Sequence, residues 1–502
     1  MKNTNTPFAK PFTPKQIQRR IQHLPACLFL CLITSFLLSN CAEEEPQRKE
    51  LHILTINDMH ASIDQFPKLA FLIDSLRNHY PDLLVCSAGD NQTGNPVNDR
   101  DSISGMPMIT LMNAVGFDLS VVGNHEFDQG TKAFAQRIKA ARFPFICANM
   151  FPPDSLNLDV QPYCSLTTKE GLRIRILGLL QLNSRGKPST NPDSVSRITF
   201  RSPYALAREY RSLKDSCDIY LALTHLGYEE DQQLADTMKD APFDVIMGGH
   251  SHTLVKEPKI IRSSLITQAG SDLHYASLIH LIWEKDKPLS RTAEVLSIDQ
   301  VSGTDPKIQE RIDKMNRNPF LNEILAQNKD TFPSEEQLGY FMADAKKFAT
   351  GADIAVQCFG GVRLTHFNSE TFKRKDIYSL DPFDNPLVLF ELSPEELTNF
   401  LEEAYQRNWQ HPTFTSGISI HYDKQKDPEK PVITYQVTNK KVRKKKRYTV
   451  VLSKYVADTY RFTHQDSGKV LPVKSTEAIV EYLKSKKLIP SYKNVRRFTT
   501  TP

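Results

Sequence analysis

The sequence has few cysteines, no paired cysteine spacing and no strong net charge, and these absences exclude several classes of protein. Only five cysteines follow Cys41, an odd number, so we do not predict a disulfide framework. No C-x-x-C occurs, which argues against a thiolate zinc site or a redox motif. A formal charge of +5 over 502 residues is too small to indicate a nucleic-acid partner. No internal repeat is evident.

The composition is that of an ordinary globular protein. Hydrophobic residues make up 40% of the chain and charged residues 24%, so disorder is not indicated. A chain of 502 residues is too long for a single hydrophobic core, and we therefore expect two domains.

The first 41 residues have the pattern of an export signal. Basic residues precede an apolar run, residues 26–38, that is shorter than the roughly 20 residues needed to span a membrane. The whole segment resembles a bacterial lipoprotein signal, with Cys41 as the lipidated first residue of the mature chain. Asn40 departs from the small residue that is usual before that cysteine. An ordinary cleaved signal and an uncleaved anchor are the alternatives, and all three imply export.

Five apolar runs in the first half each end in polar residues. The segments that follow these runs are Asn57-Asp58-Met59-His60, Gly89-Asp90, Gly123-Asn124-His125-Glu126-Phe127-Asp128, Thr224-His225 and Gly248-Gly249-His250-Ser251-His252. Stretches with helical spacing, such as residues 66–77 and 202–215, lie between the runs. Strands that alternate with helices predict an α/β layered domain, in which the carboxyl ends of the strands converge on one crevice.

That crevice would collect seven side chains that can bind a metal: Asp58, His60, Asp90, Asn124, His225, His250 and His252. Oxygen and nitrogen ligands without sulfur suit zinc, manganese, iron or cobalt. Seven ligands are too many for one ion with open positions, and they fit two ions that share a bridging carboxylate. A lone histidine in a loop is usually only solvated, and we assign no role to the histidines outside these motifs.

These motifs, in this order, resemble those of the calcineurin-like metallophosphoesterases, specifically the two-domain bacterial 5'-nucleotidase and UDP-sugar hydrolase family. The resemblance covers nearly all of the mature chain. It implies a four-layer α/β/β/α metallophosphoesterase domain followed by a smaller α/β substrate-binding domain. It implies these boundaries: a signal peptide at residues 1–40, a tether at 41–48, the catalytic domain at 49–300, a linker helix at 301–333 and the substrate-binding domain at 334–502.

The resemblance also implies a role for each ligand. Asp58, His60, Asp90 and His252 would hold one ion, and Asp90, Asn124, His225 and His250 would hold the other, so that Asp90 is the bridge. Two cations about 3.5–4 Å apart lower the pKa of a water between them and neutralise the phosphoryl oxygens that it attacks. His125 would stabilise or protonate at the transferring phosphate, and Asp128 would orient its ring.

The second half contains the candidate substrate residues. Residues 336–345 predict an amphipathic helix that ends at Gly351, and a strand follows at 352–357. Gly360-Gly361-Val362-Arg363 resembles the family motif that sends an arginine to the substrate, and Phe383 matches the ring that stacks on the nucleobase. A surface arginine and a core phenylalanine are the alternatives.

Several positions depart from the family pattern. Cys358 replaces an asparagine, Lys347 aligns with an arginine, and Phe359 stands where a glycine is usual. The late Gly-Gly-Asp-Gly-aromatic motif is missing, which leaves Tyr460 and Phe462 as candidates for a second ring. The catalytic motifs are therefore intact, whereas the substrate-selecting motifs have changed.

Two further segments carry expectations of their own. Residues 305–328 are charged with helical spacing, which predicts the linker helix, with a helix packed into the first domain as the alternative. Residues 440–447 are strongly basic and lie between two strand-like segments, 433–437 and 448–452. We expect a basic hairpin tip there, with attraction to anionic lipid or extracellular nucleic acid as the alternative.

Taken together, the sequence predicts an exported phosphohydrolase with two divalent metal ions, which releases phosphate from 5'-nucleotides by attack of metal-bound hydroxide. UDP-sugar diphosphatase and 2',3'-cyclic nucleotide phosphodiesterase activities are the alternatives within this chemistry, and a surface ligand-binding protein is the non-enzyme alternative. We expect a lipid anchor in the outer membrane, on the periplasmic side or at the cell surface, and no specific nucleic-acid partner.

Overall fold

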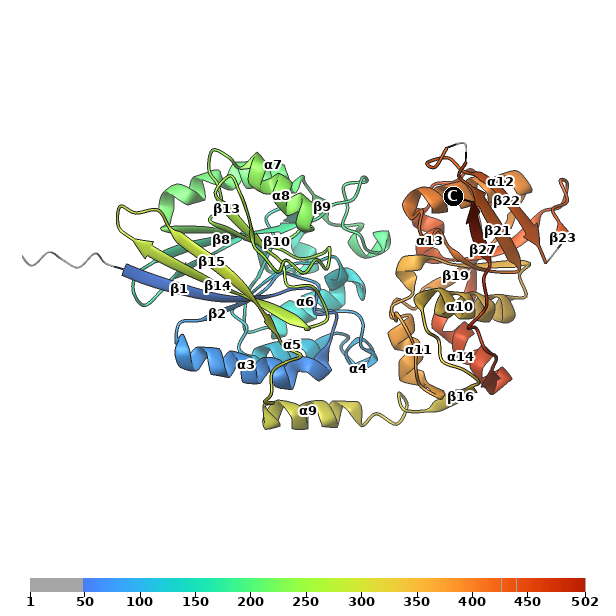
Figure 1. Ribbon diagram of the computed structural model, residues 1–502, viewed down its shortest axis with the longest axis horizontal. Helices are drawn as coiled ribbons and strands as arrows, with labels where there is room; N and C mark the ends of the chain where they lie inside the picture. The colour runs from blue at the N-terminus through green and yellow to red at the C-terminus, as the bar shows by residue number, and fades with distance from the viewer. Residues whose placement is uncertain (1–47, 426, 439, 502) are drawn as a thin grey trace, which may run out of the picture. The chain divides into compact units, whose positions relative to one another are not determined.

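The computed structural model describes residues 48–425, 427–438 and 440–501 (Figure 1). The predicted signal peptide, Cys41 and nearly all of the tether lie outside these residues. Within the described ranges, no helix is both long enough and apolar enough to cross a membrane.

The first domain is built on two β-sheets. The larger has the strand order β15 (Ser290–Ser297), β14 (Tyr275–Glu284), β1 (Arg48–Ile56), β2 (Leu84–Ser87), β3 (Leu119–Val121), β4 (Phe145–Ile146) and β6 (Val160–Gln161). The other has the order β12 (Lys259–Ile261), β13 (Ser264–Thr267), β11 (Val245–Met247), β10 (Ile219–His225), β8 (Arg173–Leu180) and β7 (Tyr163–Thr167). Two short strands, β5 (Met150–Phe151) and β9 (Thr199–Phe200), pair separately. The two sheets pack closely where Gly178 on β8 meets Ile146 on β4. A side chain at position 178 would clash with the backbone of Ile146.

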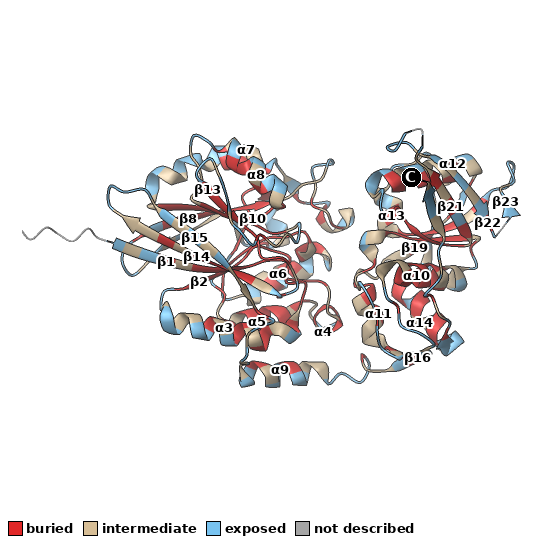
Figure 2. Cartoon of the chain, viewed as in Figure 1, coloured by how far each residue is buried: buried red, intermediate tan, exposed pale blue. Residues whose placement is uncertain are grey.

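Helices cover the outer face of each sheet. On the larger sheet they are α3 (Phe66–His79), α5 (Met106–Val115) and α6 (Gly130–Ala140), with the short α4 (Pro96–Asp99) beside α5; on the other they are α7 (Pro203–Glu209) and α8 (Tyr228–Thr237). Phe66, Leu69 and Ile73 place the apolar face of α3 in the core at helical spacing. Figure 2 shows the buried residues concentrated in the strands and on the covering helix faces. This arrangement confirms the four-layer α/β/β/α prediction.

Parallel pairing brings the strand ends to one edge of each sheet. Ile56 at the end of β1 pairs with Ser87 at the end of β2, and Leu223 on β10 pairs with Met247 at the end of β11. The loops that follow these strands carry the predicted ligands, so the pairing registers determine which loops meet.

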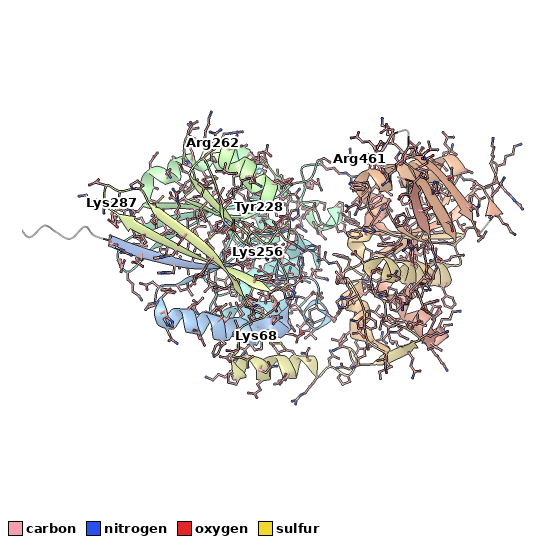
Figure 3. All side chains as sticks on the ribbon, in the orientation of Figure 1. Lys68, Tyr228, Lys256, Arg262, Lys287 and Arg461 are labelled. Carbon is pink, nitrogen blue, oxygen red and sulfur yellow. The ribbon has the colours of Figure 1, made fainter. Side chains whose placement is uncertain are left out.

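The predicted linker helix is shorter than expected. α9 (Pro306–Asn316) buries Ile308 and Ile312 in the core of the first domain, beside α3. Lys68 of α3 donates to the carbonyl of Asp299, in the segment that leads into α9 (Figure 3). Residues Ile324–Asn328 form strand β16 instead of helix, so the prediction of helix to residue 328 is wrong. Pro319 explains the break, because proline has no N–H group and disfavours helical geometry in the residue before it.

The second domain is a smaller α/β unit. Its main sheet has the order β20 (Phe414–Ser416), β17 (Ile354–Gln357), β24 (Tyr448–Ser453), β19 (Pro386–Leu392) and β25 (Lys469–Lys474). The smaller sheets are β23 (Lys440–Lys441), β22 (Val432–Val437), β21 (Ile418–Asp423) and β27 (Phe498–Thr501), and β18 (Thr371–Lys373), β16 and β26 (Leu488–Ile489). The helices are α10 (Glu335–Thr350), α11 (Arg374–Leu380), α12 (Pro394–Arg407), α13 (Lys454–Thr459) and α14 (Ser475–Lys486). Gly351 ends α10 with a φ of 67°, as predicted.

The basic run does not join two paired strands. β22 pairs with β21 and with the two-residue β23, whereas β24 belongs to the main sheet between β17 and β19. The hairpin prediction is therefore wrong for the flanking strands. Lys446 and Arg447 form ion pairs with Asp353 and Glu396, which fixes the end of the run as the chain enters β24.

Candidate active site

Asp58, His60 and His252 form the first cluster of candidate metal ligands. The Nε2 atoms of His60 and His252 lie 3.0 Å apart, and His252 Nε2 is 3.5 Å from Asp58 Oδ1. His60 Nδ1 donates to the carbonyl of Thr93 at 3.1 Å, so its Nε2 keeps a free lone pair. Two imidazole nitrogens this close repel unless a proton or a cation lies between them.

Asp90, Asn124, His225 and His250 form the second cluster, and Asp90 also lies within ligand distance of His60. His225 Nε2 is 3.0 Å from Asp90 Oδ2 and 3.3 Å from both Asn124 Oδ1 and His250 Nδ1. His225 Nδ1 donates to the carbonyl of Ala88 at 2.8 Å, which again turns Nε2 toward the cluster. The structure thus brings all seven predicted ligands together, with the Asp90 carboxylate reaching both groups.

The backbone is strained at these ligands. Asp58, His60, Asp90, His250 and His252 all have positive φ angles, between 44° and 79°. Residues other than glycine rarely adopt this conformation, which costs on the order of 1–3 kcal/mol each. Such strain persists only where the surroundings enforce it, and its concentration in one loop cluster is typical of a functional site.

Three buried side chains that the sequence analysis did not assign hold these loops. Glu126 accepts hydrogen bonds from the backbone N–H groups of Asp90, Asn91 and Gly123, and so joins two ligand loops. The Asn57 amide donates to the carbonyl of Gly270 at 2.6 Å. Gln268 accepts from the N–H of Thr253 and donates to the carbonyl of Gly249, both at 2.6 Å, and so holds both ends of the His-Ser-His segment. Their positions inside or beside the ligand motifs were the sequence signal that could have identified these three residues.

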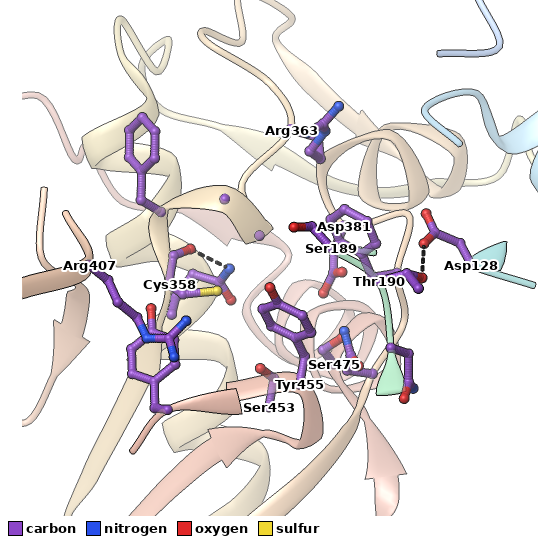
Figure 4. A pocket seen from close by; sticks show the side chains of 18 of the residues that line it. Asp128, Ser189, Thr190, Cys358, Arg363, Asp381, Arg407, Ser453, Tyr455 and Ser475 are labelled. Atoms are coloured by element: carbon purple, nitrogen blue, oxygen red, sulfur yellow. Dashed lines mark hydrogen bonds between the residues drawn. The ribbon is translucent and has the colours of Figure 1, made fainter. Parts of the chain in front are cut away.

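His125 lies close to both clusters, and its ring forms a third candidate metal-binding group with His60 and Asp90. Its Nδ1 lies 2.5 Å from Asp128 Oδ2, and its Nε2 is 3.9 Å from Asp90 Oδ2. Thr190 donates to the other Asp128 oxygen at 3.0 Å, which fixes the carboxylate (Figure 4). Burial opposes the charged ring, but Asp128 and Asp90 outweigh burial and raise the pKa of His125 to about 9. The arrangement favours an imidazolium whose Nε2 proton faces the cluster.

The clustered histidines differ in their proton affinity. Burial and the nearby His225 lower the pKa of His250 to about 4, and burial with Arg363 lowers the pKa of His60. His225 is opposite: burial lowers its pKa, but Asp90 outweighs burial and raises it to about 10. Neutral imidazoles and an ionised aspartate are the forms that bind divalent cations. The oxygen and nitrogen donor set fits two such ions, and binding one of them would require His225 to lose the proton that Asp90 favours.

One pocket contains both His125 and most of the predicted substrate residues. Asn124, His125, Asp128 and His250 line it, as do Arg363, Phe383 and Tyr460. Arg363 Nη2 lies 3.4 Å from His60 Nδ1, and the ring of Phe383 stacks near that of His125 at 5.9 Å between centroids. Tyr460 is stacked on Phe400 and covered by Arg407.

Lys347 and Phe462 do not line this pocket within the described residues. The Lys347 ammonium donates to the carbonyl of Ala352 and so supports the end of α10, and Phe462 packs against Phe390 and Phe400. The neighbouring Lys346 lines the pocket instead, with Asp381.

The comparisons with known proteins agree with this architecture. Residues 51–254 match the calcineurin-like phosphoesterase family, and residues 322–464 match the 5'-nucleotidase C-terminal domain. A 5'-nucleotidase of Vibrio parahaemolyticus is 24% identical over 450 residues, which are 77% of this chain and 78% of that protein. The trifunctional nucleotide phosphoesterase YfkN of Bacillus subtilis is 22% identical over 414 residues, 71% of this chain but only 27% of YfkN.

The crystal structure of a 5'-nucleotidase precursor from Thermus thermophilus has the same fold. It matches with a TM-score of 0.78 at 22% identity and covers 90% of this chain and 99% of that one. The sequence families, the fold and the loop cluster agree, and the chain belongs to the family that joins a calcineurin-like phosphoesterase domain to a 5'-nucleotidase C-terminal domain.

Proposed function

We propose that this protein is a metal-dependent phosphoric ester hydrolase whose preferred substrates are 5'-nucleotides. The observation that carries the proposal is one pocket lined by Asn124 and His250 of the second cluster, by the His125–Asp128 pair, and by Arg363 and Phe383. The names of the relatives support the reaction class and the nucleotide substrate.

The seven clustered side chains would hold two divalent cations of the zinc, manganese, iron or cobalt type. Asp58, His60 and His252 would hold one, Asn124, His225 and His250 the other, and Asp90 both. When bound, such a pair activates a water as the nucleophile and neutralises the phosphoryl oxygens. Glu126 and Gln268 hold the ligand loops, which would keep the two cations in position for the substrate phosphate.

His125 would act on the phosphoryl group as a proton donor. Asp128 holds Nδ1 and Thr190 holds Asp128, so Nε2 is the atom that presents the proton. A positioned general acid typically contributes on the order of 10²–10⁴-fold in rate. Arg363 would bind the phosphate through its planar guanidinium, and the nearby Phe383 ring would stack on the base.

A metal and substrate panel tests the proposal. Purified protein is stripped with a chelator, reloaded with Mn²⁺, Zn²⁺ or Co²⁺, and assayed with AMP, UDP-glucose, a 2',3'-cyclic nucleotide and p-nitrophenyl phosphate. We expect no phosphate release from the stripped protein, recovery after reloading, and the highest kcat/KM with AMP. If no metal restores hydrolysis of any of these esters, the chain is a ligand-binding protein on this fold.

We also propose export with a lipid anchor at Cys41, on the strength of the signal-like first 41 residues. Mass spectrometry of the mature N-terminus should find a lipid-modified Cys41. The Cys41→Ser variant should leave the membrane fraction. An unmodified N-terminus at another residue would instead indicate an ordinary cleaved signal.

A further inference from the structure

The pocket wall in the second domain contains two opposite charges that the proposed reaction does not use. Lys346 on α10 is 1% exposed and Asp381, which follows α11, is 4% exposed, yet both line the pocket. They form no ion pair with each other in the described part of the chain, although each charge affects the pKa of the other. Buried charges that do not pair directly are costly, and their presence in a pocket points to a ligand that completes them.

The hydrogen bonds of Lys346 leave donor capacity unused. Its ammonium donates to Gln357 Oε1 at 2.5 Å and makes only a 3.5 Å contact with the carbonyl of Val356. An ammonium has three N–H donors, and no further acceptor contacts this one among the described residues. Burial lowers its pKa, as expected for an ammonium that water does not solvate.

Asp381 has acceptor capacity unused in the same pocket. One carboxylate oxygen accepts the N–H of Asp384 at 3.3 Å, a long bond. Burial raises the pKa of Asp381, whereas Lys346 and the neighbouring Ser475 hydroxyl lower it. Ser475, also on the pocket wall, is 1% exposed, and its hydroxyl interacts with the Asp381 carboxylate without reaching ordinary hydrogen-bond geometry within the described chain. Figure 4 shows Asp381, Ser475 and Tyr455 around one space.

We infer that Lys346 and Asp381 form a subsite for a neutral polar group that offers a hydrogen-bond acceptor beside a donor. An ammonium only donates and an ionised carboxylate only accepts, so such a group satisfies both. A second phosphate offers acceptors alone and would be repelled by Asp381, and an apolar ring would leave both charges unpaired. The edge of a nucleobase and the hydroxyls of a sugar both have the required chemistry. This inference rests on the proposed function. The subsite would make the enzyme selective for the non-phosphate part of its substrate.

Substitutions that remove one charge at a time test the subsite. In metal-loaded protein, kcat/KM is measured for AMP, GMP, UMP, CMP, ribose 5-phosphate and p-nitrophenyl phosphate. Lys346→Met and Asp381→Asn should each lower kcat/KM by about 10- to 100-fold for the preferred nucleotide, mainly through KM. Hydrolysis of p-nitrophenyl phosphate, which has no group for the subsite, should change by less than about twofold in both variants.

The panel also identifies the bound group. If ribose 5-phosphate loses as much as the nucleotides, the subsite binds sugar hydroxyls; if it is unaffected, the subsite binds the base edge. Lys347→Met is the matched comparison, because the two lysines are adjacent and only Lys346 lines the pocket. A loss of nucleotide selectivity in Lys347→Met but not in Lys346→Met overturns the inference. Equal losses on every substrate overturn it too, because the residues would then support the fold alone.

A binding measurement separates this inference from the proposed function. Titration calorimetry of metal-free protein with adenosine, guanosine, uridine and cytidine needs no catalysis. We expect Lys346→Met to weaken binding of the preferred nucleoside by about tenfold or more. If the wild-type protein hydrolyses no ester but Lys346→Met still weakens nucleoside binding, the subsite stands and the proposed reaction fails. If the wild-type protein hydrolyses esters but Lys346→Met binds nucleosides as tightly as the wild type, only the subsite is rejected.

Discussion

The loop cluster of the first domain and the pocket wall of the second position their side chains by different means. In the first domain, the ligands follow the ends of parallel strands, and backbone hydrogen bonds such as Asp58 N to Gly89 O at 3.0 Å fix the loops. In the second domain, Arg363, Phe383 and Lys346 come from separate loops and a helix, packed by aromatic side chains.

This difference explains which motifs are intact. Binding two cations requires particular donor atoms at fixed positions, so almost no other residue can replace a ligand. Hydrogen bonding and stacking to a substrate can be supplied by several residue types from several positions. This is consistent with the sequence analysis, which predicts intact motifs in the first domain and changed ones in the second; in the structure, Cys358 and Lys346 both line the pocket.

The largest expected effect is at the shared carboxylate of the first domain. Asp90→Ala removes the side chain that lies close to ligands of both clusters, and we expect kcat to fall by at least about 10³-fold because both proposed ions would lose a ligand. Metal content, measured by plasma emission spectrometry, should fall below two per chain. His274→Ala, at an exposed histidine outside the clusters, is the control and should keep both. Full activity in Asp90→Ala would mean that the clusters are not the catalytic centre.

His125 comes next, because we propose that it donates a proton instead of binding a metal ion. His125→Ala should lower kcat by about 10²- to 10⁴-fold while the metal content stays at two per chain. That separation distinguishes a proton donor from a ligand. A variant that loses metal along with activity would assign His125 to the ligand set instead.

In the second domain the expected effects are on KM. Phe383→Ala should cost about 1–3 kcal/mol of nucleotide binding, seen as a higher KM for AMP with little change for p-nitrophenyl phosphate. Phe462→Ala is the informative comparison, since that ring packs against Phe390 and Phe400. It should lower the melting temperature rather than raise KM. The reverse pattern would identify Phe462 as the stacking ring.

The sequence predicts the first domain better than the second for a physical reason. Each ligand lies directly after an apolar strand, so residue type and local pattern together indicate both its position and its chemistry. The positive φ angles of Asp58 and His250 could not be read from the sequence, because strain at a non-glycine residue depends on the surrounding loops. The support from Glu126 also depends on loops that meet only in the folded chain.

In the second domain, burial decides which charged residue faces the pocket, and adjacent residues can differ. Lys346 and Lys347 have the same side chain, but α10 turns the first toward the pocket and lets the second bond the carbonyl of Ala352. The partners of β22 and β24 depend on sheet order, which hydrophobic patterning does not determine. Contacts between distant segments are thus what the sequence could not provide.

The smallest expected effect concerns a buried acid that supports the ligand loops. Asp231 is fully buried and accepts a hydrogen bond from Thr224, the residue before His225, at 2.7 Å. Its other oxygen has no hydrogen-bond partner within the described residues, and burial raises its pKa to about 8. Asp231 therefore keeps its proton in the folded chain, whereas in the unfolded chain, where its pKa is about 3.9, it releases that proton.

Stability should accordingly fall as pH rises from about 4 to about 8, because ionising Asp231 is easier in the unfolded chain. Asp231→Asn removes this penalty and can keep the acceptor for Thr224, so its melting temperature should exceed that of the wild type by about 2–4 °C at pH 8.5 and by less at pH 5. Calorimetry in chelator removes any contribution from metal binding. Asp236→Asn, at an exposed acid paired with Arg262, should show no such pH-dependent difference. An equal difference in melting temperature at both pH values for Asp231→Asn would mean that Asp231 is ionised in the folded chain. The loop at Thr224 would then be held by a charged carboxylate instead of a neutral hydrogen-bonded acid.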